Sequence, residues 1–157
     1  MNRTRVLFLC TGNSARSQIA EAFLRQLAGD RFEAYSAGLE PKGIHPYTRQ
    51  VLAEAGLDIS GQTSNDVAQF LGRVHFGYLI TVCSNAEARC PIFPGVSVRL
   101  HWPFDDPAAA EDDGRGGLFD VGERPVSDTE NPPLLARFRR VRDEIKARID
   151  AWLATDP

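Results

Sequence analysis

The sequence predicts an α/β fold: one doubly wound domain in which a parallel sheet carries helices on both faces. Apolar runs of strand length alternate along the chain with segments whose apolar residues recur at helical spacing. Strands that alternate with helices favour right-handed crossovers, which make neighbouring strands parallel. The chain has 157 residues, of which 43% are hydrophobic and 25% charged, and this size suits a single domain over residues 1–157.

The first half of the chain predicts two strand-helix units. Residues 6–10 form an apolar run that suits a buried strand, and residues 18–27 follow with helical spacing. Residues 33–38 predict a short strand that stops at a glycine. The segment 46–57 begins with proline, which is favoured in the first turn of a helix, and it predicts the second helix. Residues 63–71 supply an N-cap and one or two further helical turns.

The second half predicts two more strands and a long final helix. Residues 76–83 are apolar and β-rich, as expected of a strand buried on both faces, and residues 96–102 alternate like a last strand. Between them, residues 84–90 can form two helical turns before Pro91 stops them. From residue 134 onward one apolar stripe predicts a helix packed on the core, and the stripe consists of Leu135, Phe138, Val141, Ile145, Ile149, Trp152 and Leu153.

The segment between the first strand and the first helix has the composition of an anion-binding loop. It reads Cys10-Thr-Gly-Asn-Ser-Ala-Arg16-Ser17 and ends at a helix N-terminus, where backbone N–H groups and aligned peptide dipoles favour a negative guest. Arg16 can grip a tetrahedral oxyanion with two N–H groups, and the same field favours the nucleophilic thiolate of Cys10. The residues expected to bind the anion are Thr11, Gly12, Asn13, Ser14, Ala15, Arg16 and Ser17.

Several residues of this loop have expected structural tasks. Gly12 would relieve the tight turn, and Asn13 could bond to neighbouring backbone. Ser17 could cap the helix and hydrogen-bond the thiolate of Cys10. The alternative is a buried core cysteine before a capped helix, but that arrangement leaves Arg16 without a task.

The loop resembles the phosphate loop of the low-molecular-weight protein tyrosine phosphatase superfamily. The resemblance covers nearly the whole chain, apart from an acidic, Gly-rich segment near residues 109–132. It implies a four-stranded parallel sheet with the strand order 2-1-3-4, which would place the strand ends at Cys10 and Cys83 side by side. Ligands of such sheets bind beyond the carboxyl ends of the strands. The segment 109–132 is polar and rich in Gly and Pro, and we expect a mobile surface insert there.

Two further cysteines narrow this resemblance. Cys83 and Cys90, in the stretch Thr81-Val-Cys-Ser-Asn-Ala-Glu-Ala-Arg-Cys-Pro91, are similar to the redox pair of the thioredoxin-coupled arsenate reductases built on the same fold. Zinc is a competing use of cysteine, but no Cys-x-x-Cys or Cys/His cluster at ligand spacing accompanies the pair, so no metal site is expected. Cys83 could instead simply close a buried strand. We favour redox roles for both cysteines.

Carboxylates follow the last expected strand, in the stretch His101-Trp-Pro-Phe-Asp-Asp-Pro107. An oxygen that leaves phosphate or arsenate must take up a proton, and a carboxyl group near the loop can supply it. The resemblance implies that the general acid is Asp106, with Asp105 as the second choice. A plain polar turn is the alternative.

Residues around the loop also bear on potassium, which some reductases of the family bind. Asn13, Glu21, Ser36 and Thr63 match the residues that surround the phosphate loop in the family. Residue 65 departs from the pattern, because potassium-binding members have aspartate there and this chain has Asn65. The lost charge would have helped to hold a hard cation. No cofactor is expected, and potassium binding is doubtful.

The resemblance implies that the protein reduces arsenate. Cys10 would attack arsenic while Asp106 protonates the departing oxygen. Cys83 would then attack Cys10 and release arsenite, and Cys90 would attack Cys83 to leave a disulfide for thioredoxin, or a low-molecular-weight thiol such as mycothiol, to reduce. Two alternatives stay open. One is a phosphatase acting on phosphotyrosine or small phosphomonoesters, which needs neither Cys83 nor Cys90, and the other is a non-catalytic oxyanion-binding or redox-sensing module.

Charge and composition limit the expected partners. The formal net charge of −3 gives no support for nucleic-acid binding, whose footprint is a basic face. The chain shows no signal segment and no apolar run that approaches twenty residues, so we expect neither export nor membrane spanning. Its three cysteines, an odd number, argue against a static disulfide framework. We therefore expect a cytoplasmic protein. A monomer is expected as well, although none of these observations gives the oligomeric state.

Overall fold

Four parallel strands form one sheet in the order β2-β1-β3-β4 in the computed structural model, which describes residues 3–90, 94–108 and 132–157. The strands are β1 (Thr4–Cys10), β2 (Phe32–Gly38), β3 (Tyr78–Thr81) and β4 (Val98–His101). The central strand β1 pairs with β2 on one side and with β3 on the other. The expected strand order is therefore confirmed.

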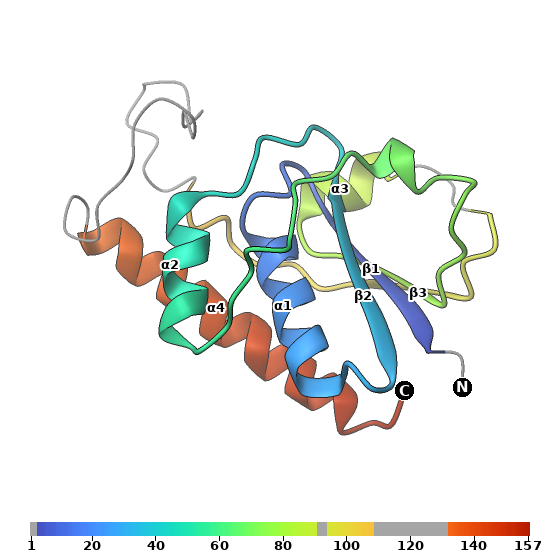
Figure 1. Ribbon diagram of the computed structural model, residues 1–157. Helices are drawn as coiled ribbons and strands as arrows, with labels where there is room; N and C mark the ends of the chain where they lie inside the picture. The colour runs from blue at the N-terminus through green and yellow to red at the C-terminus, as the bar shows by residue number, and fades with distance from the viewer. Residues whose placement is uncertain (1–2, 91–93, 109–131) are drawn as a thin grey trace.

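Helices alternate with these strands along the chain. They are α1 (Arg16–Ala28), α2 (Pro46–Glu54), α3 (Ser84–Arg89) and α4 (Pro132–Leu153), and a 3-10 turn, η1, spans Val67–Gln69. Helix α4 packs on both α1 and α2, and these three helices lie together on one side of the strands (Figure 1). Helix α2 ends three residues earlier than expected, where the chain turns at Gly56 with a φ of 83° that suits glycine.

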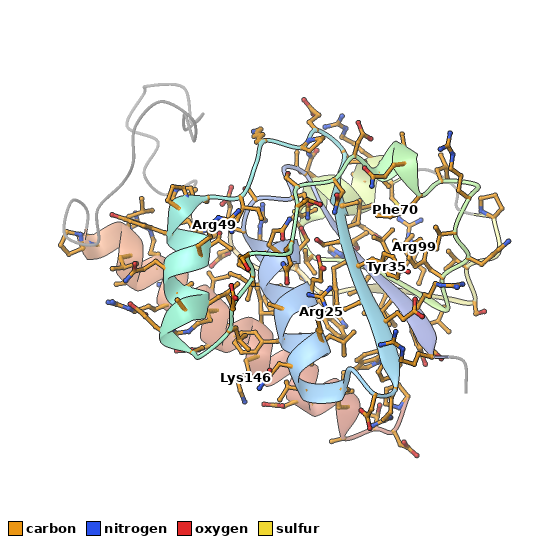
Figure 2. All side chains as sticks on the ribbon, in the orientation of Figure 1. Arg25, Tyr35, Arg49, Phe70, Arg99 and Lys146 are labelled. Carbon is orange, nitrogen blue, oxygen red and sulfur yellow. The ribbon has the colours of Figure 1, made fainter. Side chains whose placement is uncertain are left out.

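Both faces of the sheet are covered. Residues 6–10 of β1 are all buried, although successive side chains of a strand point to opposite faces. On β2, Phe32 packs on Trp152 of α4 with ring centroids 5.3 Å apart. Tyr35 faces the other way and contacts Phe70, next to η1, with centroids 5.6 Å apart; Figure 2 labels this second pair. The doubly wound α/β class is confirmed.

The apolar stripe of α4 packs as predicted. Leu135, Phe138, Val141, Ile145 and Ile149 are buried, and Trp152 and Leu153 are half-buried against the core. Removing a buried ring such as that of Phe138 typically costs about 3–5 kcal/mol, so α4 is a principal support of the sheet. Within the described residues, no helix is long and apolar enough to cross a membrane. The expected insert at 109–132 lies outside the described residues, except for Pro132, which begins α4.

The sheet brings the two expected reactive strand ends together. Leu9 of β1 lies opposite Thr81 of β3 in the parallel register. Cys10 follows Leu9 directly, and Cys83 follows Thr81 after one residue. Both cysteines therefore emerge from neighbouring strands at the carboxyl edge of the sheet, where ligands of doubly wound folds bind.

Candidate active site

The loop that joins β1 to α1 is held from outside by segment 39–45, which follows β2. Backbone N–H groups of this segment donate to loop carbonyls over 2.8–3.2 Å, and the pairs are Leu39 to Cys10, Glu40 to Thr11, Lys42 to Gly12 and His45 to Ser14. The N–H and C=O groups of a trans peptide point in opposite directions. Bonds to the outward carbonyls therefore turn loop amides toward the interior of the loop, where an anion would bind.

A pocket of about 460 Å³ opens over this loop. Its lining combines the loop with the ends of β3 and β4, and includes Cys10, Thr11, Gly12, Ser14, Ala15, Arg16, Lys42, Cys83, Asn85, Asp105 and Asp106. Both thiols, both cations and both carboxylates of this set therefore face one volume. The pocket has the size of small-ligand sites in general and suits a tetrahedral oxyanion.

Cys10 is almost fully buried, and two donors point at its sulfur. The backbone N–H of Asn13 lies 3.2 Å from Cys10 Sγ, and Ser17 Oγ lies 2.8 Å from it. The side-chain amide of Asn13 donates to Ser17 Oγ at 2.7 Å, which leaves the Ser17 hydroxyl hydrogen free to donate to the sulfur. Donors arranged in this way stabilise a negative sulfur, as a nucleophilic cysteine requires.

The sequence predicted the wrong residues for two structural tasks in the loop, the helix cap and the tight turn. Ser17 does not cap α1, because the helix begins at Arg16 with Ala15 as its N-cap and no side-chain cap bond. The other role predicted for Ser17, a hydrogen bond to the Cys10 sulfur, is confirmed. The left-handed residue of the turn is Asn13, with a φ of 48°, rather than Gly12. The glycine that tight packing requires is Gly38, where an added Cβ would lie 2.6 Å from the carbonyl oxygen of Thr11.

Arg16 and Asp106 lie beside each other at the pocket. The guanidinium nitrogen Nη2 of Arg16 is 3.7 Å from Asp106 Oδ2, and Nη1 donates to the backbone carbonyl of Phe104 at 3.2 Å. The Asp106 side chain is 41% exposed, and its other oxygen accepts from the N–H of Ala108 at 3.0 Å. Asp105 also lines the pocket. The role of Asp106 as the general acid stays a prediction.

Cys83 lies two residues beyond the end of β3 and is the N-cap residue of α3. Its sulfur accepts from the backbone N–H of Ala86 at 3.3 Å and lies 3.5 Å from the hydroxyl oxygen of Thr11. Asn85 donates its side-chain amide to the same Thr11 oxygen at 2.8 Å, so the Thr11 hydrogen is available to the sulfur. A residue of the anion loop thus touches the second thiol.

Cys90 lies apart from this group. It is half-buried at the carboxyl end of α3, and it is not among the described residues that line the pocket. Burial raises the pKa of the Cys90 thiol, and the positive charge of Arg99 opposes this shift. The structure therefore brings Cys10, Arg16, Cys83 and Asp106 together and leaves the third cysteine at the far end of a helix.

The residues expected around a potassium ion bind one another. Burial raises the pKa of Glu21, whose carboxylate accepts from Ser36 at 2.5 Å and pairs with Arg25. The side-chain amide of Asn65 donates to the backbone carbonyls of Ser36 and Thr63, each at 3.0 Å. The amide of Asn65 thus binds carbonyl oxygens of the kind that coordinate a hard cation. Weak potassium binding stays a prediction.

Sequence reasoning missed three residues of this neighbourhood. Lys42 lines the pocket, Asn85 orients Thr11, and His45 caps α2 by accepting from the backbone N–H of Tyr47 at 3.0 Å. Burial lowers the pKa of His45 to about 4, so its ring stays neutral at pH 7. The proline that begins α2, directly after His45, could have indicated the cap. No local sequence pattern marks Asn85 or Lys42 as site residues, because their partners come from distant parts of the chain.

The fold and site agree with comparisons to known proteins. Residues 5–155 match the low molecular weight phosphotyrosine protein phosphatase family, and the chain belongs to this family. An arsenate reductase of Halalkalibacterium halodurans is 41% identical to it over 155 residues, which are 99% of both chains.

Solved structures of arsenate reductases share the fold. One of them, in the phosphate binding state, has a TM-score of 0.69 at 28% identity and matches 97% of this chain and 98% of its own. The thioredoxin-dependent arsenate reductase of Corynebacterium glutamicum has a TM-score of 0.64 at 27% identity and matches 98% of this chain and 61% of its own. The predicted resemblance to the arsenate reductases of the phosphatase superfamily is therefore confirmed.

Proposed function

We propose that the protein reduces arsenate to arsenite through Cys10, Cys83 and Cys90, with thioredoxin as the electron donor. One observation carries the proposal: a second thiol, Cys83, faces the same pocket as the nucleophile Cys10. A phosphatase cycle ends when water attacks the cysteinyl-phosphate, and it has no use for a second sulfur beside the first. A two-electron reduction does need one, because a second thiol can take the first cysteine into a disulfide.

The first step is displacement at arsenic. Arsenate binds to the loop amides and to Arg16, and the Cys10 thiolate attacks the arsenic atom. Asp106 gives a proton to the departing oxygen, which leaves as water. The position of Asp106 next to Arg16 supports this role, since the acid then lies beside the group that orients the oxyanion. The product is an adduct with a bond between Cys10 Sγ and arsenic.

The second step reduces arsenic and oxidises sulfur. Cys83 attacks Cys10 Sγ, the bond between sulfur and arsenic breaks, and its electron pair leaves with arsenic as arsenite. The two electrons come from the thiols, which now form a Cys10–Cys83 disulfide. Cys90 then attacks Cys83 and frees Cys10 for another cycle. Thioredoxin reduces the resulting Cys83–Cys90 disulfide by exchange, a choice that the thioredoxin-dependent relative supports.

A coupled assay tests this function. The purified protein should oxidise NADPH in the presence of arsenate, thioredoxin and thioredoxin reductase, and omission of thioredoxin should stop the reaction. Cys83→Ser should remove this turnover while its melting temperature and phosphate binding stay near those of the wild type. Normal multiple turnover by Cys83→Ser would contradict the relay, and absence of arsenate turnover in the wild type would contradict the function.

Phosphomonoester hydrolysis is the second candidate, because the phosphatase family to which the chain belongs needs only the nucleophile, the loop and an acid. Cys10, Arg16 and Asp106 supply these groups in one pocket. Assay of the same preparation with p-nitrophenyl phosphate measures this activity. A phosphatase rate that Cys83→Ser and Cys90→Ser leave unchanged, together with no arsenate turnover, would favour hydrolysis as the main function.

A further inference from the structure

Lys42 holds a fixed place at the mouth of the anion loop. Its backbone N–H donates to the carbonyl of Gly12 at 2.9 Å. Its side chain then runs over Gly12, since a Cβ added to that glycine would lie 3.4 Å from Lys42 Cδ. The same residue lines the pocket together with Cys10 and Arg16. Lys42 thus approaches the pocket from the Gly12 end of the loop, whereas Asp106 lies at the Arg16 end.

Within the described residues, the charged groups nearest to Lys42 have their ion pairs with other partners. Arg16 already faces Asp106 and the carbonyl of Phe104. Glu40, the nearest acidic residue in sequence, pairs with Arg89 at 2.8 Å; Arg89 is the main cause of its lowered pKa, and the positive charge of Lys42 adds a smaller effect. Across the described residues, the Lys42 ammonium makes no ion pair and no hydrogen bond. A cation that makes no hydrogen bond or ion pair with the described residues, and that lies at the mouth of an anion pocket, is placed to meet a negative ligand.

We propose that Lys42 is a substrate-binding residue whose ammonium group contacts an oxygen of the bound oxyanion. Arsenate and phosphate carry more than one negative charge at neutral pH, and a single guanidinium that also faces a carboxylate does not balance them. Lys42 supplies the second cation and leaves the acid end of the loop free for proton transfer. The identity of the oxyanion as arsenate rests on the function proposed above, whereas the binding role does not.

The composition of the chain allows a direct test of this contact. The sequence contains two lysines, Lys42 and Lys146. Lys146 lies on the outer surface of α4, where it pairs with Asp150 at 2.8 Å, and it can be located in Figure 2. Acetylation with sulfo-N-hydroxysuccinimide acetate, followed by peptide mass spectrometry, reports on both amines in the same sample. Lys146 therefore serves as an internal control.

Saturating phosphate should slow acetylation of Lys42 at least fivefold and leave acetylation of Lys146 unchanged, relative to sodium chloride at the same ionic strength. The reference salt matters because screening alone changes the reactivity of both amines. Equal acetylation rates of Lys42 with phosphate and with chloride would overturn the proposal. This readout needs no arsenate and no reductant, so it is independent of the reductase function.

Variants supply a second measurement. Lys42→Met should weaken phosphate binding, measured by calorimetry, by about tenfold, because it removes a charged hydrogen-bond donor from the anion. It should raise the KM for arsenate by a similar factor and leave kcat within threefold. Lys42→Arg should restore most of the binding, and Lys146→Met should behave like the wild type. Circular dichroism melting curves confirm that each variant is folded.

The outcomes separate this inference from the proposed function. Wild-type phosphate affinity in a folded Lys42→Met variant would overturn the role of Lys42, whether or not arsenate is reduced. Weakened phosphate binding in Lys42→Met but not in Lys146→Met supports that role, even if the arsenate assay shows no turnover and the proposed function fails.

Discussion

The proposed Cys83–Cys90 disulfide cannot form while α3 keeps its helical structure. The two cysteines flank α3 and are seven residues apart, so their Cα atoms are separated by about 10 Å along the helix axis. A disulfide tolerates Cα separations of no more than about 7 Å. Helix α3 must therefore unwind before Cys90 can attack Cys83, and easier unwinding should speed this step.

The contacts of α3 indicate that unwinding it costs little free energy. Ala86 is the buried side chain of the helix, and the rest of its anchorage is polar. Glu87 pairs with Arg99 at 3.0 Å, and Arg89 pairs with Glu40 at 2.8 Å. Exposed pairs of this kind contribute about 0–1 kcal/mol each. Unwinding would also expose Cys90 and lower its raised pKa toward the usual value, because burial is the main cause of the shift.

An exposed alanine of α3 allows the stability of this helix to be changed alone. Ala88 is exposed, so Ala88→Gly removes no buried contact and costs the helix about 0.5–1 kcal/mol through chain entropy. If unwinding precedes disulfide formation, the unwound population and the disulfide rate should rise about two- to fivefold, since 1.4 kcal/mol corresponds to tenfold. Ala147→Gly makes the same change at an exposed position of α4 and is the matched control.

The assay uses the Cys10→Ser background, so that Cys83 and Cys90 are the remaining thiols. Oxidised glutathione supplies the oxidant, iodoacetamide stops the reaction, and peptide mass spectrometry gives the rate of Cys83–Cys90 formation. Ala88→Gly should be faster than the parent, and Ala147→Gly should match it. Equal rates in all three proteins would refute the unwinding argument. So would equal amide hydrogen exchange of residues 83–90 in the reduced and disulfide-bonded states.

Three further predictions follow from the site and from the packing of α2. Cys10→Ser should abolish both arsenate reduction and p-nitrophenyl phosphate hydrolysis. Cys90→Ser should stop thioredoxin-dependent arsenate turnover but keep the hydrolysis rate within twofold of the wild type. Steady-state assays of both activities check this. Phosphate at a hundredfold excess over its dissociation constant should stabilise the fold by about 2.7 kcal/mol. Potassium should raise the melting temperature no more than sodium does, because the side-chain N–H of Asn65 already binds the carbonyl oxygen of Ser36. A rise in melting temperature that is specific to potassium would contradict this. Hydrogen bonds from Arg139 lower the pKa of Glu54 from 4.5 to about 2, so the ion pair stabilises the fold above pH 4.5 and is lost as the pH falls toward 2. Glu54→Gln should therefore melt lower than the wild type at pH 7, and the gap should narrow between pH 4.5 and pH 3; a constant gap would show that the charge does not matter.

The sequence by itself determined the features that depend on local patterns. Alternating apolar runs and helical spacing indicated a doubly wound sheet, because each element must bury one face or both. The loop that begins at Cys10 could be identified because a strand end, a small polar loop and a helix start are contiguous in the chain. The buried stripe of α4 was visible for the same reason, since its period is that of one helix.

Only the tertiary structure decided which side chains from distant parts of the chain join Ser17 and Arg16 at the site. Asn85 reaches Thr11 across 74 positions of the chain, and Arg16 reaches Phe104 across 88. Lys42 faces the pocket because four backbone bonds dock segment 39–45 on the loop carbonyls. Gly38 is required by a close approach to the neighbouring loop, although in sequence it marks only the end of a strand. Such contacts depend on strand register and on the packing of separate loops, and neither leaves a periodic trace in the sequence.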